Sequence, residues 1–206
     1  MRPKFIYFDL GNVLLRFSRQ RQFRQMAEAV GTTAEKAEAA FFQTGLYEAY
    51  ERGELTTGQV YDRFCGELGV NCDIARLQRA GNDIFWPNTS MIPVVSALWS
   101  AGWRLGILSN TCASHWEFVS DGRYAFLSNL FEVTTLSYEV AAMKPDRRIY
   151  EAAAEKAGVA ASEILFTDDL PENVAGGREF GFDAVIFTTA PDFVNELRNR
   201  GIRISY

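Results

Sequence analysis

The sequence predicts an α/β fold, a Rossmann-like parallel-sheet core with a small inserted helical cap domain. Several β-rich runs are nearly continuous in apolar character, as expected of strands buried on both faces of a parallel sheet. Helix-like stretches separate the last four runs, and this alternation is typical of βα units. The five predicted strands are Lys4–Leu10, Trp103–Asn110, Leu130–Ser137, Glu163–Asp169 and Asp183–Thr189.

The long interval between the first and second predicted strands indicates the insertion. From Arg16 to Ser90 the residue patterns are helical and contain no convincing strand. Two pairs have the spacing of capping boxes that open helices, Thr32 with Glu35 and Thr56 with Gln59. Glycines suited to helix ends separate the helices: Gly31, Gly53 and Gly69. We therefore expect residues 1–15 and 91–206 to form the α/β core and residues 16–90 to form the helical cap.

The composition excludes several classes of protein. The net charge of −5 at pH 7 argues against a nucleic-acid partner bound through bulk positive charge, and the apolar content argues against disorder. Three cysteines and one histidine, without metal-ligand spacing, argue against a disulfide framework and a structural zinc site. The N-terminal residues fit neither a signal peptide nor a membrane span, so we expect a cytoplasmic protein with no membrane contact. The sequence leaves the oligomeric state open.

Polar residues follow most of the predicted strands at their carboxyl ends, where open parallel sheets bind ligands. These residues are Asp9, the pair Ser109 and Asn110, Ser137 followed by Lys144, and the pair Asp168 and Asp169. Converging carboxylates and a backbone carbonyl suit Mg²⁺, and a carboxylate can also act as a nucleophile that forms an aspartyl-phosphate. Hydroxyl, amide and ammonium donors suit the oxygens of a phosphoryl group. The pattern therefore favours phosphoryl transfer assisted by a metal.

Four segments in order resemble the motifs of the haloacid dehalogenase-like hydrolases. They are Phe8-Asp9-Leu10-Gly11-Asn12-Val13, Leu108-Ser109-Asn110-Thr111, Lys144-Pro145 and Phe166-Thr167-Asp168-Asp169. The resemblance runs from residue 4 to about residue 190, and the helical insertion falls where that superfamily places a small cap. Within the superfamily the chain is most similar to bacterial phosphatases of the α-D-glucose-1-phosphate phosphatase type, a likeness that includes Glu51-Arg52-Gly53-Glu54 in the cap.

The resemblance implies a role for each residue that matches a motif. Asp9 would be the nucleophile and a ligand of Mg²⁺, together with the backbone carbonyl of Gly11 and the carboxylate of Asp169. Asp168 would act in the outer shell of the metal through a bound water, although the two acids could exchange roles. Ser109, Asn110 and Lys144 would bind the phosphate of a small phosphorylated substrate. Lys144 would also pair with Asp9 and lower the pKa of that carboxyl.

One position departs from the pattern of the superfamily. Most of its phosphatases carry a second aspartate two residues after the nucleophile, which protonates the leaving oxygen, and here that position is Gly11. Another group or water could supply the proton, or the substrate could have a good leaving group, as a hexose 1-phosphate does. The alternatives are a metal-independent 2-haloacid dehalogenase, which the paired acids disfavour, and a non-catalytic binding or regulatory protein of the same fold.

Residues of the predicted cap and the single histidine complete the candidates. Arg16, Tyr47, Arg52 and Trp86 could face the substrate, or they could be ordinary surface or core residues. His115 is expected on a helix surface or at the rim of the substrate site. None of these residues lies in a readable motif, so the sequence does not identify the substrate beyond a small phosphorylated metabolite.

Overall fold

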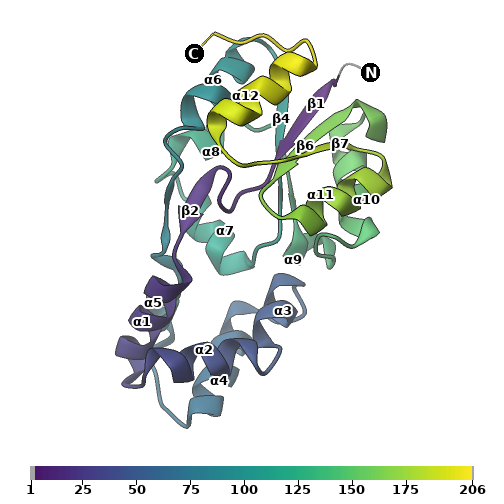
Figure 1. The fold of residues 1–206 in the computed structure, drawn as a ribbon. Helices are drawn as coiled ribbons and strands as arrows, with labels where there is room; N and C mark the ends of the chain where they lie inside the picture. Colours follow the sequence, from purple (N-terminus) through teal and green to yellow (C-terminus); the bar gives the residue numbers. More distant parts are fainter. Residues whose placement is uncertain (1–2, 206) are drawn as a thin grey trace.

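The computed structural model describes residues 3–205 and contains a five-stranded, all-parallel sheet. Figure 1 shows the sheet with helices packed around it. The strand order is β5-β4-β1-β6-β7. The strands are β1 (Phe5–Phe8), β4 (Arg104–Ser109), β5 (Val133–Leu136), β6 (Ile164–Asp168) and β7 (Asp183–Ile186). Each lies within one of the five predicted runs, so the predicted α/β class is confirmed.

Helices bury both faces of the sheet, which explains the continuous apolar runs. On one face, Ile6 and Phe8 of β1 belong to a core shared with four helices. These are α6 (Ile92–Ser100), α7 (Ala113–Ser120), α8 (Ala125–Asn129) and α12 (Ala190–Asn199). On the other face, Phe5 and Tyr7 pack with α10 (Arg147–Ala157) and α11 (Pro171–Phe180). Alternate residues of one strand therefore serve two separate cores.

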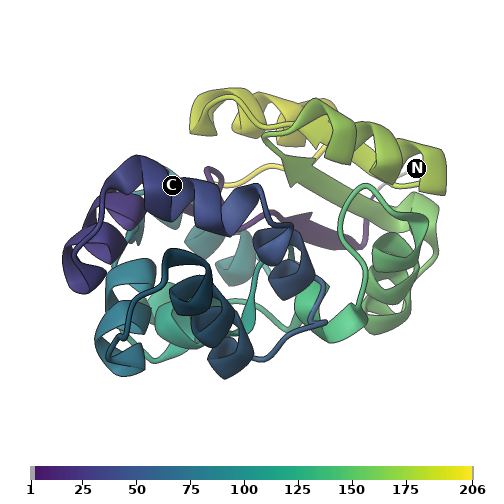
Figure 2. The same cartoon turned by 90° about the horizontal axis from the view of Figure 1, so that it is seen from below.

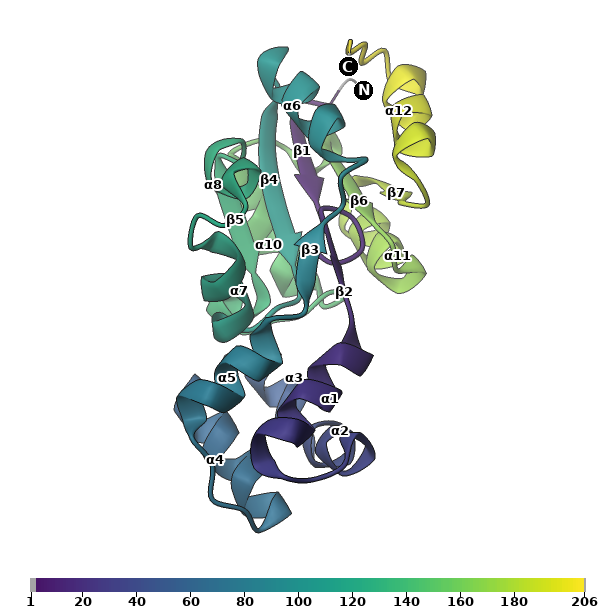
Figure 3. The same ribbon diagram turned by 90° about the vertical axis from the view of Figure 1, so that its left-hand side faces the viewer.

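Five helices between β1 and β4 form a third core at one end of the molecule (Figures 1 and 2). They are α1 (Arg19–Val30), α2 (Ala34–Phe42), α3 (Leu46–Glu51), α4 (Thr57–Leu68) and α5 (Ile74–Asn82). Their shared apolar core includes Phe23, Phe41 and Phe64, each at most 3% exposed. The strands of the sheet run toward these helices, so the carboxyl ends of the strands face them (Figure 3). The boundaries of the cap at residues 16 and 90 stay a prediction.

The expectation that Arg16 to Ser90 contains no strand is wrong. Strand β2 (Leu15–Phe17) pairs with β3 (Phe85–Pro87) in an antiparallel ribbon, with Arg16 opposite Trp86. The ribbon lies between the five helices and the main sheet (Figure 3). Each strand is only three residues long, and the two are far apart in the sequence. Neither strand is long enough to show a periodicity, so only their pairing in space makes them recognisable.

Local details of the inserted helices agree with the predicted caps in part. Thr56 and Gln59 form the predicted capping box at the start of α4, whereas Thr33, not Thr32, caps α2.

The structure also joins Cys65 to Cys72 in a disulfide and leaves Cys112 buried and free. The odd cysteine count argued against a framework of several disulfides but could not exclude one local pair. Two short elements complete the described chain: the α-helical turn α9 (Ser137–Val140) and the 3₁₀ helix η1 (Ala161–Glu163).

Gly53 sets how closely α3 approaches the core of the protein. Its φ is +69°, and a Cβ atom built on it would lie 2.1 Å from the carbonyl oxygen of Tyr138 in α9. Because Gly53 has no Cβ atom, α3 and α9 can contact each other directly. Only glycine can adopt this positive φ and also lie so close to the Tyr138 carbonyl.

We predict that Gly53→Ala lowers the free energy of unfolding by about 2–4 kcal/mol, because a clash with backbone adds to the strain of a positive φ. Gly31→Ala is the matched control, since Gly31 has φ +73° and a Cβ atom built on it would have no other atom within 4 Å. This control should lose only about 1 kcal/mol. Urea unfolding of both variants measures the difference, and equal losses would show that the contact with Tyr138 contributes nothing.

Candidate active site

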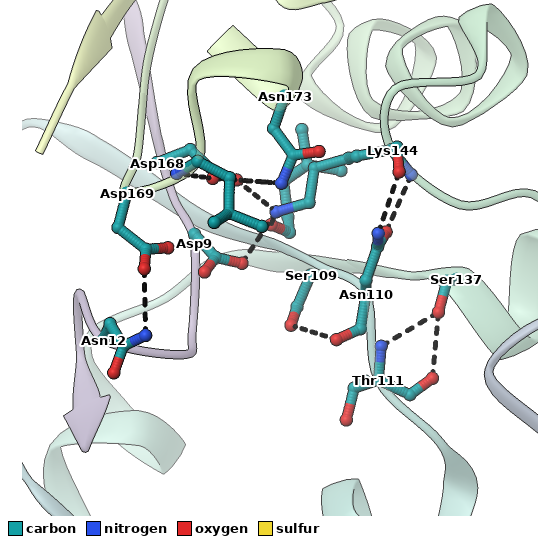
Figure 4. A network of polar contacts seen from close by, with 12 residues as sticks. Asp9, Asn12, Ser109, Asn110, Thr111, Ser137, Lys144, Asp168, Asp169 and Asn173 are labelled. Atoms are coloured by element: carbon teal, nitrogen blue, oxygen red, sulfur yellow. Dashed lines mark hydrogen bonds and ion pairs between the residues drawn. The ribbon is translucent and has the colours of Figure 1, made fainter. Parts of the chain in front are cut away.

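The carboxyl ends of β1, β4 and β6 bring the predicted residues together (Figure 4). Strand β1 lies between β4 and β6, so Asp9 is flanked by the residues that follow both neighbours. In open α/β sheets the ligand crevice forms at this edge, where the strand order reverses. The structure therefore places Asp9, Ser109 and Asp168 close together in space.

The ammonium of Lys144 is at the centre of this group. Its Nζ donates hydrogen bonds to Asp9 Oδ1 at 2.7 Å, to Asp168 Oδ2 at 2.5 Å and to the carbonyl of Leu108 at 2.9 Å. The residue is only 4% exposed. All three donor positions of the ammonium are therefore used on three different strand ends, which fixes the side chain (Figure 4).

Asp168 is fully buried and held from several directions. Its Oδ1 accepts hydrogen bonds from the backbone N–H of Leu170 at 2.9 Å and from Asn173 Nδ2 at 3.0 Å. Its Oδ2 accepts from Lys144 and, at 3.1 Å, from Asn173. Both oxygens are thus already engaged, as expected of a carboxylate that orients its neighbours.

Asp169 is more open and faces the same space as Asp9. Its Oδ2 accepts a hydrogen bond from Asn12 Nδ2 at 2.9 Å, and Asn12 adopts a positive φ of 56°. One oxygen each of Asp9, Asp168 and Asp169 lie within 4.8 Å of one another. Three carboxylates and one lysine leave two net negative charges when all are ionised. These hard oxygen donors and this charge fit one Mg²⁺ ion.

Electrostatics at Asp9 differ from the simple expectation. Burial raises the pKa of the Asp9 carboxyl to about 7, and the charges of Asp168 and Asp169 act in the same direction. Lys144 lowers that pKa, as predicted, but does not offset the burial. Burial alone would lower the pKa of Lys144, whereas its two carboxylate partners raise it above the usual range. The lowering expected from Lys144 is therefore present, and the net rise of the Asp9 pKa comes from burial, which the sequence does not show.

The residues predicted to bind phosphate lie beside Asp9, with their polar groups partly occupied. The Asn110 side chain accepts a hydrogen bond from the backbone N–H of Lys144 at 2.7 Å and donates one to its carbonyl at 2.9 Å. Asn110 thereby fixes the backbone that carries the lysine. The Ser109 hydroxyl is buried and donates to the Asn110 carbonyl at 3.3 Å. The Gly11 carbonyl accepts from the Val13 N–H at 2.7 Å, which leaves its second lone pair for another partner.

A cavity of about 680 Å³ opens above Asp9 and is lined from both sides. The core contributes Asp9, Lys144 and Asp169, and the inserted helices contribute a second set of residues. That second set includes Arg19, Phe42, Tyr47, Glu48 and Glu51. A substrate attached to Asp9 would therefore contact residues of α1–α3.

Sequence reasoning identified some lining residues and missed others. Tyr47 lines the cavity as anticipated, but Arg16, Arg52 and Trp86 are not among its lining residues. His115 is buried rather than on a helix surface, and burial lowers its pKa to about 4. The missed residues are Asn12, Asn173 and Glu51, of which Glu51 carried a signal in the motif Glu51-Arg52-Gly53-Glu54 without a role attached to it.

This fold and this constellation define a class of hydrolase, and a family model agrees. The model described as haloacid dehalogenase-like hydrolase matches residues 3–181. The chain therefore belongs to the haloacid dehalogenase-like hydrolases. The superfamily and the enzyme class expected from the four motifs are confirmed.

Phosphatases are among the known proteins that this chain resembles. The chain is 26% identical to D-ribitol-5-phosphate phosphatase of Bacteroides thetaiotaomicron over 94% of this chain and 96% of that protein. It is 23% identical to the sesquiterpene phosphatase astK of Aspergillus oryzae, over 95% of each. A HAD family enzyme of Bacteroides thetaiotaomicron, solved with magnesium and inorganic phosphate, superposes with a TM-score of 0.81 at 25% identity. That alignment covers 91% of this chain and 95% of the other.

These relatives support the general class of phosphatases, which is coarser than the glucose-1-phosphate phosphatase type that the sequence resembles. They are phosphatases by name, but neither curated relative just described is a glucose 1-phosphate phosphatase. The narrower resemblance therefore stays a prediction. Within residues 3–205, no helix has both the length and the apolar character needed to cross a membrane.

We predict that Lys144→Met lowers the free energy of unfolding by about 3–5 kcal/mol at pH 8, because two buried carboxylates lose their cation. The loss should be smaller at pH 5. Since the pKa of Asp9 is raised to about 7, a proton neutralises this carboxyl below that pH and removes part of the repulsion. Urea unfolding at both pH values, in the presence of EDTA, measures the effect.

Lys156→Met is the control for that experiment. Lys156 is exposed, with its Nζ 2.7 Å from the Thr134 carbonyl and 3.6 Å from Glu139, so its removal should cost about 1 kcal/mol or less. The proposed role of Lys144 is to neutralise the two buried carboxylates. It would be contradicted if Lys144→Met lowered the free energy of unfolding no more than this control does, or by the same amount at pH 5 and pH 8.

Proposed function

We propose that this protein is a Mg²⁺-dependent phosphatase that hydrolyses a small phosphorylated metabolite through an aspartyl-phosphate intermediate. The observation that carries the proposal is Asp9, held by Lys144 beside two further aspartates at the floor of a large cavity. A carboxylate in this position can attack phosphorus, and the neighbouring cation and metal site can balance the phosphate charge. The phosphatase names of the relatives support the same reaction.

The residues would divide the work as follows. Asp9, Asp169 and the Gly11 carbonyl would hold Mg²⁺, with Asp168 behind them as the carboxylate that fixes Lys144 and Asn173. The metal, when bound, would neutralise charge on the phosphoryl oxygens and on Asp9. Ser109, the Asn110 backbone and Lys144 would bind the phosphoryl oxygens and orient phosphorus toward Asp9. Catalytic roles therefore fall to Asp9 and Lys144.

The cavity and the relatives support a proposal for the substrate class. Polar groups on α1 and α3 face the phosphate site, so the organic part of the substrate is expected to carry hydroxyl groups. We propose a sugar phosphate, with a hexose 1-phosphate as one candidate because its leaving oxygen is acidic. A polyol phosphate is the other candidate, since a relative is named for D-ribitol 5-phosphate. A panel that contains hexose 1-phosphates, their 6-phosphate isomers and D-ribitol 5-phosphate distinguishes these possibilities.

The first test of the nucleophile is Asp9→Asn, a nearly isosteric change. Loss of the carboxylate should reduce phosphatase activity by at least about 10³-fold, because no covalent intermediate can form. Asp62→Asn, at an exposed position on α4, is the matched control and should retain activity. Phosphate release from the substrate panel measures both, with circular dichroism to verify the fold. Full activity of folded Asp9→Asn would rule out the mechanism.

The second test concerns the metal. Mg²⁺ should raise the melting temperature of the EDTA-treated protein, because it binds the folded state only, and should restore phosphatase activity. Asp169→Asn should lose most of the rise in melting temperature, whereas Glu172→Gln, an exposed acid of the same cavity, should keep it. A 2-haloacid dehalogenase would instead keep its activity in EDTA. Activity toward a haloacid in EDTA, without phosphatase activity in Mg²⁺, would favour that alternative.

A further inference from the structure

Gly11 leaves the site without the usual donor for the leaving oxygen, so a substrate with a poor leaving group needs a proton from another source. Gly11 lines the cavity, and a Cβ built on it would lie 3.8 Å from Asp9 Oδ2. The glycine therefore stands where a side chain would reach the reacting atoms. The leaving oxygen of a bound phosphate monoester points away from Asp9, because nucleophile and leaving group are roughly in line. The opposite wall of the cavity is formed by the inserted helices.

Glu51 lies on that opposite wall, at the last turn of α3. It is 6% exposed and lines the same cavity as Asp9 and Lys144. Neighbouring contacts hold α3 in place: the Tyr50 hydroxyl accepts a hydrogen bond from the Ser114 N–H at 3.2 Å, and Gly53 contacts Tyr138. Glu51 is thus a buried carboxyl on a helix that is fixed against the catalytic core.

The surroundings of Glu51 keep its proton to neutral pH. Burial raises its pKa to about 7 and outweighs the hydrogen bond from the Tyr47 hydroxyl, which lowers it. The charged and titratable groups that face Glu51 are Tyr47 and Glu48 of α3, Arg19 of α1, Cys112 before α7, and Lys144 of the core. No counter-ion at hydrogen-bond distance offsets the burial of Glu51 among the described residues, in contrast to Asp9.

Other lining groups are less suited to donate a proton. His115 lies in an adjoining pocket with Gly11 and Glu51, and burial lowers its pKa to about 4, so it is neutral at pH 7. Burial raises the pKa of Tyr47 well above its usual value, which makes the phenol a poor acid. Lys144 is committed to Asp9 and Asp168. Glu172 is exposed, on the same side as the metal site.

We propose that Glu51 is the general acid that protonates the leaving oxygen, in place of the residue missing at Gly11. This inference rests on the proposed phosphatase function. In the first step Asp9 forms a bond to phosphorus while the bond from phosphorus to the leaving oxygen breaks. The electron pair of that bond stays on the oxygen, which takes the proton of Glu51 and leaves as an alcohol. Glu51 becomes a carboxylate.

The second step restores both groups. A water molecule adds to phosphorus, the bond from phosphorus to Asp9 breaks, and Asp9 regains its carboxylate. The Glu51 carboxylate accepts the proton that this water loses. The net reaction consumes one water and releases an alcohol and inorganic phosphate, with Glu51 and Asp9 unchanged. One residue thus acts first as acid and then as base.

The experiment compares leaving groups in wild type and Glu51→Gln, both with Mg²⁺. The probes are p-nitrophenyl phosphate, whose leaving group is stable without a proton, and three primary alkyl phosphates: D-ribitol 5-phosphate, D-glucose 6-phosphate and glycerol 3-phosphate. For the fastest alkyl phosphate, Glu51→Gln should lower kcat by about 10²- to 10⁴-fold. For p-nitrophenyl phosphate the loss should be less than about fivefold, since only the acid step is impaired. The wild-type alkyl phosphate rate should also fall above about pH 7, and Glu51→Gln should lose this limb.

Glu48→Gln is the matched control, one turn earlier on the same helix and on the same cavity. It makes the same substitution of an amide for a carboxyl group and should change the rates with both kinds of substrate by the same factor. Equal losses with both substrates in Glu51→Gln, or no loss, overturn the inference and show a role in binding or folding only. Wild type that hydrolyses p-nitrophenyl phosphate but no alkyl phosphate also overturns it, while the proposed function stands. Wild type inactive on every phosphate overturns the proposed function itself.

Discussion

The ammonium of Lys144, held between the carboxylates of Asp9 and Asp168, is the interaction on which the site depends. It joins the ends of β1, β4 and β6, because its third hydrogen bond goes to the Leu108 carbonyl. Two carboxylates that are nearly inaccessible to water repel each other strongly unless a cation lies between them. Asn110 fixes the lysine backbone and Asn173 fixes Asp168, so amide groups maintain the geometry that the charges require.

Two buried carboxyls line the cavity, those of Asp9 and Glu51, and they differ in their surroundings rather than in their burial. Asp9 and Glu51 both have a pKa raised to about 7 by burial. Asp9 lies against an ammonium and beside a site for a divalent cation, which favours its ionised form. Glu51 is not among the three carboxyls of that metal site, so a cation bound there would favour the ionised form of Asp9 more than that of Glu51. Two similar side chains can therefore act as nucleophile and acid because their surroundings differ.

Much of this organisation was predictable from local patterns. The five parallel strands follow from continuous apolar runs, and the capping box at Thr56 follows from four residues. What the patterns missed depends on contacts between distant segments or on pairing in space. The β2–β3 ribbon pairs two three-residue strands on either side of five helices, and the Cys65–Cys72 disulfide joins two of three cysteines. The ribbon has no signal within a single segment, and two cysteines seven residues apart do not by themselves show that they form a disulfide.

For the site, the sequence by itself determined which polar residues end the strands, and hence the family and the candidate nucleophile. Parallel strands put their carboxyl ends at one edge, so Asp9, Ser109 and Asp168 had to converge once the strands were recognised. Tertiary structure alone decided the electrostatics. The depth of Asp9, the position of the Lys144 ammonium between two acids, and the approach of Glu51 to the cavity all arise from packing between separate segments of the chain. A pKa depends on burial and neighbours in space, and neither is written in local sequence.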